Sequence, residues 1–164
     1  MDTLSHTLWG GGLFGFRGRP KTALLFGALP DLAAFGPWLA YRLATGRLEP
    51  GKPDLAIIPD FVFAAYDASH SLLVALAAVA LLALRSRGLA FAALAWPVHI
   101  LVDIPTHTRA YFPTPFLWPV SDLTVNGFSW GQPWIWYPNL AGIALLFAWR
   151  GANRLGRGAA KGAS

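Results

Sequence analysis

The chain has 164 residues, of which 55% are apolar and 13% are charged, and its formal net charge is +5. This length is near that of one domain, and so large an apolar fraction excludes an ordinary soluble fold and indicates an integral membrane protein. The sequence contains no cysteine, which excludes disulfides, thiolate metal ligands and cysteine nucleophiles. The basic residues cluster beside apolar segments and are interpreted as membrane anchors, so we expect no nucleic-acid partner.

The apolar pattern predicts an all-α, polytopic membrane helix bundle that forms one domain over residues 1–150. The first segment, 3–16, is short for a membrane span and contains glycines suited to close helix packing. The second, 22–44, includes Pro30 and Pro37, so we expect a kinked or broken helix there.

Three further apolar segments complete a bundle of about five transmembrane or partly inserted helices. The segment 60–84 ends in a long uninterrupted apolar run and predicts a continuous membrane helix. The segment 88–104 is expected to kink at Pro97 and to end at Pro105, and the segment 134–149 forms the last helix.

Charge and aromatic residues predict the orientation in the membrane. Nine of the thirteen basic residues fall on one side if the segments alternate, which places the C-terminus in the cytoplasm and the N-terminus outside. The loop 106–133 combines aromatic residues with prolines and is expected to lie extracytoplasmically in the headgroup region. The basic tail, 151–164, is rich in Gly and Ala and is predicted to be disordered.

A small set of histidines and aspartates lies within or beside the apolar segments. Ionisable side chains are costly in hydrocarbon, so such a set indicates a functional site. Counted at about 1.5 Å per residue from the cytoplasmic ends, five of these residues lie at similar depths of about 15 to 24 Å. The candidate metal ligands are His6, Asp31, His70, His99, Asp103 and His107.

His99 and Asp103 are four residues apart, so they share one helix face. His107 follows Pro105 and is expected to hang from the helix end and fold back over the site. The candidates exceed what one tetrahedral zinc ion needs, so either two ions share bridging carboxylates or some residues hold the ligands in place.

The order and spacing of short motifs resembles the predicted membrane-bound metal-dependent hydrolases of the YdjM type, found in bacterial inner membranes. The motifs are Ser5-His6, Gly27-Ala28-Leu29-Pro30-Asp31, Ser69-His70-Ser71, His99-Ile100-Leu101-Val102-Asp103, Thr106-His107 and Phe116-Leu117-Trp118-Pro119. The resemblance implies a multi-pass protein with His6, Asp31, His70, His99 and Asp103 as metal ligands and a hydrolytic activity. Family members often carry an arginine shortly before the third motif, where this chain has Ala64-Ala65-Tyr66-Asp67.

We therefore expect metal-assisted hydrolysis of an ester or phosphoester, with a lipid or lipid-linked substrate from the surrounding bilayer. One or two divalent ions, zinc first and manganese or iron as alternatives, are the expected cofactor. Asp31, Asp103 and His107 are the candidate catalytic residues, and Arg109 is the candidate for holding a phosphate. The alternatives are a transporter that handles protons or metal ions and a non-catalytic membrane scaffold.

Overall fold

The protein is all-helical over the part of the chain that the structure describes, as predicted. The computed structural model describes residues 1–162, so 163 and 164 of the predicted tail lie outside the described residues. Within 1–162 no β-strand occurs. The helices are α1 (Thr3–Phe14), α2 (Pro20–Ala44), α3 (Asp60–Ser69), α4 (Leu72–Arg85), α5 (Arg87–Ala93), α6 (Ala95–Thr106) and α7 (Pro133–Gly162), with the short 3₁₀ turns η1 (Gly15–Arg17) and η2 (Leu55–Ile57).

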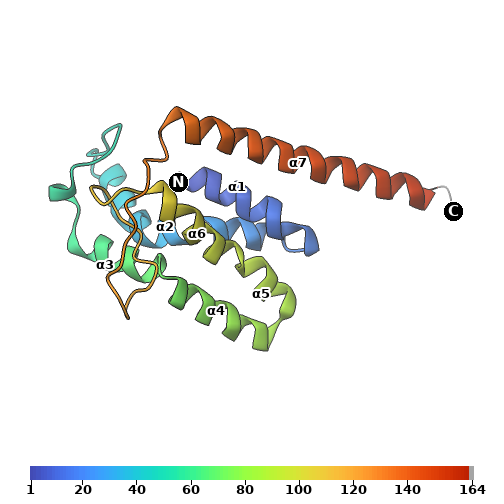
Figure 1. Cartoon of the computed structure of the whole chain (residues 1–164), viewed down its shortest axis with the longest axis horizontal. Coiled ribbons are helices and arrows are strands. Elements are labelled where there is room, and N and C mark those ends of the chain that lie inside the picture. Colours follow the sequence, from blue (N-terminus) through green and yellow to red (C-terminus); the bar gives the residue numbers. More distant parts are fainter. Residues whose placement is uncertain (163–164) are drawn as a thin grey trace.

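The long helices lie side by side and run in alternating directions along the chain (Figure 1). Helix α1 packs against α2, α6 and α7, and α2 also packs against α3. The N-terminus, α3 and the irregular segments 45–59 and 107–132 gather at one end, which we call the loop end (Figure 1). The short connections between α1 and α2 and between α4 and α5 lie at the opposite end, which we call the turn end.

Glycines allow α1 and α2 to approach each other closely. A Cβ atom at Gly10 would lie 2.7 Å from the carbonyl oxygen of Ala23, and one at Gly27 would lie 2.5 Å from the carbonyl oxygen of His6. Small residues at such crossings let two helix backbones pack without intervening side chains. The close approach at Gly27 brings the first turns of α1 next to the middle of α2.

The continuous helix predicted over 60–84 is wrong, because α3 and α4 are separate helices that meet at an angle of 57°. At the break, backbone and side-chain groups form hydrogen bonds to the segment 107–132, which we call the long loop. The Ser71 hydroxyl donates to the carbonyl of Trp118, and the Leu72 N–H donates to the carbonyl of Phe116 at 2.9 Å. Tertiary contacts with a distant segment therefore override the apolar run that favours one long helix.

The prolines act differently from the prediction in two helices. Helix α2 is unbroken through Pro30 and Pro37. In the predicted segment 88–104 the helix is interrupted at Leu94, between α5 and α6, rather than at Pro97 itself. Pro97 has no N–H, so the carbonyl four residues earlier, beside Leu94, loses its helical partner and the break falls there.

Two helical stretches are long and apolar enough to cross a membrane: α2, and Arg87–Thr106, which comprises α5 and α6. The bent pair of α3 and α4 makes a third if it counts as one span. Helix α1 has 12 residues, fewer than a span needs. Helix α7 continues to Gly162 and so includes most of the tail, 151–164. The disorder that the sequence predicts for this tail stays a prediction.

A buried cluster closes the loop end of the bundle. Trp38 of α2 and Val62 and Tyr66 of α3 pack with Phe112 of the long loop. The Tyr66 hydroxyl donates to the Phe112 carbonyl at 3.0 Å. Burial of large aromatic side chains supplies several kcal/mol, about 1.5 to 3 for each side chain. The cluster thereby fixes α3 and the loop against α2, next to the polar residues described below.

We predict that Gly27→Ala destabilises the protein, while Gly36→Ala in the same helix does not. A methyl group at Gly27 meets the α1 backbone, whereas a Cβ at Gly36 meets nothing within 4 Å. Overpacking of this kind costs about 1 to 3 kcal/mol. Thermal unfolding of the two variants in detergent, followed by circular dichroism, measures the difference. Equal melting temperatures for both variants would contradict the close crossing of α1 and α2.

Candidate metal centre

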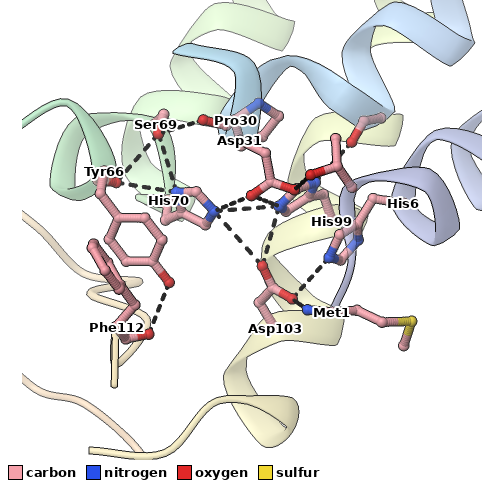
Figure 2. Close-up of polar contacts among 12 residues, drawn as sticks. Met1, His6, Pro30, Asp31, Tyr66, Ser69, His70, His99, Asp103 and Phe112 are labelled. Carbon is pink, nitrogen blue, oxygen red and sulfur yellow. Dashed lines mark hydrogen bonds and ion pairs between the residues drawn. The ribbon is translucent and has the colours of Figure 1, made fainter. Parts of the chain in front are cut away.

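Five buried polar side chains, from α1, α2, α6 and the end of α3, meet near the loop end (Figure 2). His6 comes from α1, Asp31 from the middle of α2, and His99 and Asp103 from α6. His70 lies directly after α3, where α3 and α4 separate. None of the five is more than 9% exposed. The structure thus brings together residues that lie up to 97 positions apart in the chain.

The local structure aims His70 and the α6 pair at one another. His70 ends α3, its N–H donates to the Tyr66 carbonyl at 2.8 Å, and its ring stacks on that of Tyr66. His99 and Asp103 share one face of α6, and His99 Nε2 lies 3.1 Å from Asp103 Oδ2. The spacing of four residues therefore places an imidazole and a carboxylate side by side, as the sequence predicts.

The tautomer of His99 follows from its hydrogen bond. His99 Nδ1 lies 2.7 Å from the carbonyl oxygen of Gly27. A carbonyl oxygen only accepts hydrogen bonds, so Nδ1 carries the proton. In the neutral ring, Nε2 then presents a lone pair toward Asp31, His70 and Asp103. A backbone carbonyl on the second nitrogen is also the usual partner of a histidine that binds a metal ion.

The same reasoning applies to His70. Its Nδ1 lies 3.2 Å from the Tyr66 carbonyl oxygen and 3.1 Å from the Ser69 hydroxyl oxygen. The Ser69 hydroxyl donates its proton to the Pro30 carbonyl at 3.0 Å, so it accepts from His70. His70 Nδ1 is therefore the protonated nitrogen, and Nε2 presents a lone pair into the site (Figure 2).

Four acceptor atoms consequently face one another. His70 Nε2 and His99 Nε2 are 3.3 Å apart. Asp31 Oδ1 lies 3.5 Å from His70 Nε2 and 3.7 Å from His99 Nε2. Asp103 Oδ2 lies 3.7 Å and 3.1 Å from the same two nitrogens. Ligand atoms about 2.0 to 2.1 Å from a tetrahedral zinc ion are about 3.4 Å from each other, which matches these separations.

One of the four acceptors is buried without a hydrogen-bond donor. Asp103 Oδ2 receives no hydrogen bond among the described residues. A buried charged oxygen without a partner is costly, and a cation between it and the two imidazoles would remove that cost. The residues present therefore fit a metal ion held by nitrogen and oxygen. Two overlapping groups have suitable geometry: His70, His99 and Asp103, and His6, Asp31 and His99.

The other oxygen of Asp103 has its own partners. His6 Nε2 lies 2.8 Å from Asp103 Oδ1, His107 Nδ1 lies 3.4 Å from it, and the Met1 amino group also contacts it. The His6 ring stacks on the His99 ring, with centroids 3.5 Å apart. Asp103 thus connects two sets of histidines, which is the arrangement of a bridging carboxylate.

His107 lies where the sequence predicts, at the end of α6 and folded back toward the site. Its Nδ1 is 3.2 Å from the backbone carbonyl oxygen of Asp103. Burial lowers the pKa of the His107 imidazole to about 4, more than the neighbouring Asp103 carboxylate raises it. His107 is therefore neutral near pH 7 and carries a lone pair that can accept a proton.

A cavity of about 260 Å³ adjoins the centre on the loop side. Asp31 and His107 line it together with aromatic side chains from α2 and the long loop, among them Phe35, Tyr111 and Trp130. A concave site with apolar walls and a few polar groups is typical of a small-molecule site. A small molecule in this cavity would lie beside Asp31 and His107.

The structure places Arg109 outside this cavity. Its guanidinium is exposed and donates to the carbonyl of Thr124 at 2.9 Å. The basic side chain that lines the cavity is Lys52, from the segment between α2 and α3. The sequence analysis missed Lys52, since no motif marks it. It also missed Thr3, whose hydroxyl donates to Asp31 Oδ2 at 2.7 Å, although the position of Thr3 beside the Ser5-His6 motif could have indicated it.

Comparison of the chain with protein-family models, curated proteins and solved structures finds no match. The resemblance to YdjM-type proteins therefore stays a prediction. The interpretation of the centre rests on the geometry given above.

Proposed function

We propose that this protein is a membrane-bound, metal-dependent hydrolase that attacks an ester or phosphoester. The convergence of four acceptor atoms carries the proposal: each imidazole nitrogen lies 3.1–3.7 Å from the other nitrogen and from both carboxylate oxygens. The atoms are His70 Nε2, His99 Nε2, Asp31 Oδ1 and Asp103 Oδ2. The motif resemblance supports the same activity. The adjoining cavity supplies the room that a substrate needs.

Imidazole nitrogen and carboxylate oxygen ligands favour zinc, with manganese and iron as alternatives. When bound, such an ion lowers the pKa of a water molecule that it coordinates and polarises the bond under attack. His70, His99, Asp31 and Asp103 would hold this ion. Asp103 also faces His6 and His107 through Oδ1, so a second ion, if one binds, would share that carboxylate.

His107 is the residue best placed to move a proton. It borders both the centre and the cavity, and its imidazole is neutral. In the hydrolysis of a phosphoester, the water oxygen forms a bond to phosphorus while the ester P–O bond breaks. The proton that the water loses passes to His107 or to a carboxylate of the site, and the departing oxygen receives one in turn.

The charge distribution supports the predicted orientation in a bacterial inner membrane. The turn end carries Arg17, Arg19, Lys21, Arg85 and Arg87. None of the eight acidic residues lies at that end. Basic residues mark the cytoplasmic side, so the turn end would be cytoplasmic, with the loop end and the metal centre toward the outside. In this proposal the remaining predicted segments, α1 and α7, join the two or three candidate spans as membrane-inserted helices.

The position of the buried polar side chains favours an enzyme over a transporter. Among the described residues, the buried polar side chains lie toward the loop end. They include Ser5, His6, Asp31 and the other residues of the centre. Toward the turn end, the buried residues of α5 are Ala90, Ala92 and Ala93. A proton or metal pathway would need polar groups across the whole membrane thickness.

Metal content tests the centre without knowledge of the substrate. We expect purified wild type to bind one or two equivalents of zinc, and His70→Ala and Asp103→Asn to lose it. Loss of a ligand should weaken binding by more than the about 10- to 100-fold that loss of an outer partner costs. Asp122→Asn removes an exposed carboxylate and is the control. Elemental analysis, with size-exclusion chromatography as the folding check, gives the result. Folded wild type that takes up no metal would refute the proposal.

Hydrolysis should depend on the metal and on the carboxylates. We expect zinc-loaded protein to hydrolyse a bis-aryl phosphodiester or a phosphatidic acid substrate in detergent, and chelation to abolish turnover until zinc is restored. Asp31→Asn should lower kcat by at least about 100-fold, since a proton-transfer role contributes about 10²- to 10⁴-fold and loss of a ligand would weaken metal binding as well. Chelated protein with full turnover would exclude a metal-dependent step.

The orientation can be tested because the chain has no cysteine. In spheroplasts, a membrane-impermeant maleimide should label Ala56→Cys at the loop end, and it should label Ser86→Cys at the turn end only after the membrane is made permeable. This follows from the excess of basic residues at the turn end. Labelling in the reverse pattern would invert the proposed topology.

A further inference from the structure

The residues that line the cavity beside the metal centre include one lysine, Lys52, besides His107 and Met1, whose amino group contacts Asp103. This residue lies in the segment between α2 and α3, far in sequence from the metal ligands. The cavity is otherwise lined by carboxylates such as Asp2 and Asp31 and by aromatic and hydroxyl side chains. Lys52 is thus a cation in a cavity whose other walls are mainly aromatic, hydroxyl and carboxylate side chains.

Several contacts hold Lys52 over the cavity. Gly51 adopts a left-handed conformation, with φ of 97°, that turns the chain just before Lys52. The hydroxyl of Tyr111 donates to the Pro53 carbonyl at 3.1 Å, which ties this segment to the long loop. The ammonium of Lys52 lies 5.1 Å from the centre of the Tyr111 ring and 3.5 Å from the Ser129 hydroxyl oxygen. Its position is thus set by two loops that meet at the cavity.

Lys52 has hydrogen-bonding capacity left for a ligand. An ammonium group has three donors, and one of them reaches the Ser129 hydroxyl. Among the described residues, no carboxylate lies within ion-pair distance of Lys52, although Asp31 lines the same cavity. A cation held over a cavity without a carboxylate partner is suited to an anionic ligand, and lysine commonly binds phosphate as a point charge.

The remaining walls are apolar. Phe35, Phe112 and Trp130 line the cavity beside Lys52. These side chains favour an apolar or aromatic substituent. Asp31 lines the same cavity, and Asp103 contacts His107, which also lines it. The cavity therefore offers a positive group, an apolar surface and a metal centre within one space of about 260 Å³.

We propose that Lys52 forms an anion-binding subsite that receives the phosphate of a phosphoester whose apolar substituent lies against the aromatic walls. This inference rests on the proposed function, because it assigns the substrate class of the same site. It also replaces Arg109, the phosphate-binding candidate from the sequence, by a residue that lines the cavity.

The test is titration of inorganic phosphate into detergent-purified protein by calorimetry, after zinc loading and removal of free zinc. We expect Lys52→Gln to weaken phosphate binding at least about tenfold, since the variant loses a hydrogen bond between two charged groups. Lys52→Arg should restore most of the affinity. Arg47→Gln, in the same segment but outside the cavity, and Arg109→Gln should leave the affinity unchanged.

Metal content measured on the same samples separates this proposal from the proposed function. If phosphate binding depends on Lys52 but no variant holds zinc, the anion subsite stands and the metal-dependent hydrolase does not. If zinc is bound and Lys52→Gln binds phosphate as tightly as wild type, the subsite is refuted and the metal centre stands. Absence of phosphate binding by wild type, or its loss in Arg109→Gln in place of Lys52→Gln, would also overturn the subsite.

The source of the phosphate is resolved by a second pair of probes. Phosphatidic acid in mixed micelles and glycerol 3-phosphate in solution carry the same phosphate monoester. Competition by the lipid alone would support a membrane substrate, and competition by the soluble ester would support a water-soluble one. In Lys52→Gln, neither probe should compete with phosphate as it does in wild type. A probe that competes equally well in the variant and in wild type would contradict the proposal.

Discussion

The buried carboxylate of Asp103 is the group on which the rest of the centre depends. Its Oδ1 receives a hydrogen bond from His6, while its Oδ2 faces His70 and His99 and receives none among the described residues. Burial of an unpaired charge costs several kcal/mol, so Asp103 is tolerated only when cationic or donating groups surround it. Helices α1 and α6 and the end of α3 must all be in place to supply those groups. The burial of Asp103 therefore constrains both the packing of the bundle and the chemistry of the centre.

Two unusual features of the helices serve this constraint. Gly27 lies at the close crossing of α1 and α2, and its carbonyl accepts from His99 Nδ1, so one residue takes part in both the helix packing and the tautomer of a candidate ligand. The break between α3 and α4 places His70 at a helix end, where Tyr66 and Ser69 orient its ring. Both features direct an imidazole lone pair to the same point, which a pair of straight, loosely packed helices would not do.

The two ends of the bundle differ in chemistry, as the proposed membrane enzyme with a site near one surface requires. Basic residues without acids occupy the turn end, and the loop end carries the aromatic cluster, the cavity and the metal ligands. The two loops that meet over the cavity are joined by Tyr111 and Lys52. The proposed anion subsite therefore belongs to the part of the molecule where a headgroup or a small ester would enter.

The sequence alone predicts the helical class, the absence of thiolate chemistry and the polar residues that lie in apolar segments. It also determined that His99 and Asp103 share a face, because that follows from helix geometry alone. The tertiary structure produces the break after His70, since the loop carbonyls of Phe116 and Trp118 that stabilise the break are distant in sequence. It likewise decided that Lys52 and not Arg109 lines the cavity, because loop positions depend on long-range packing that no local pattern encodes.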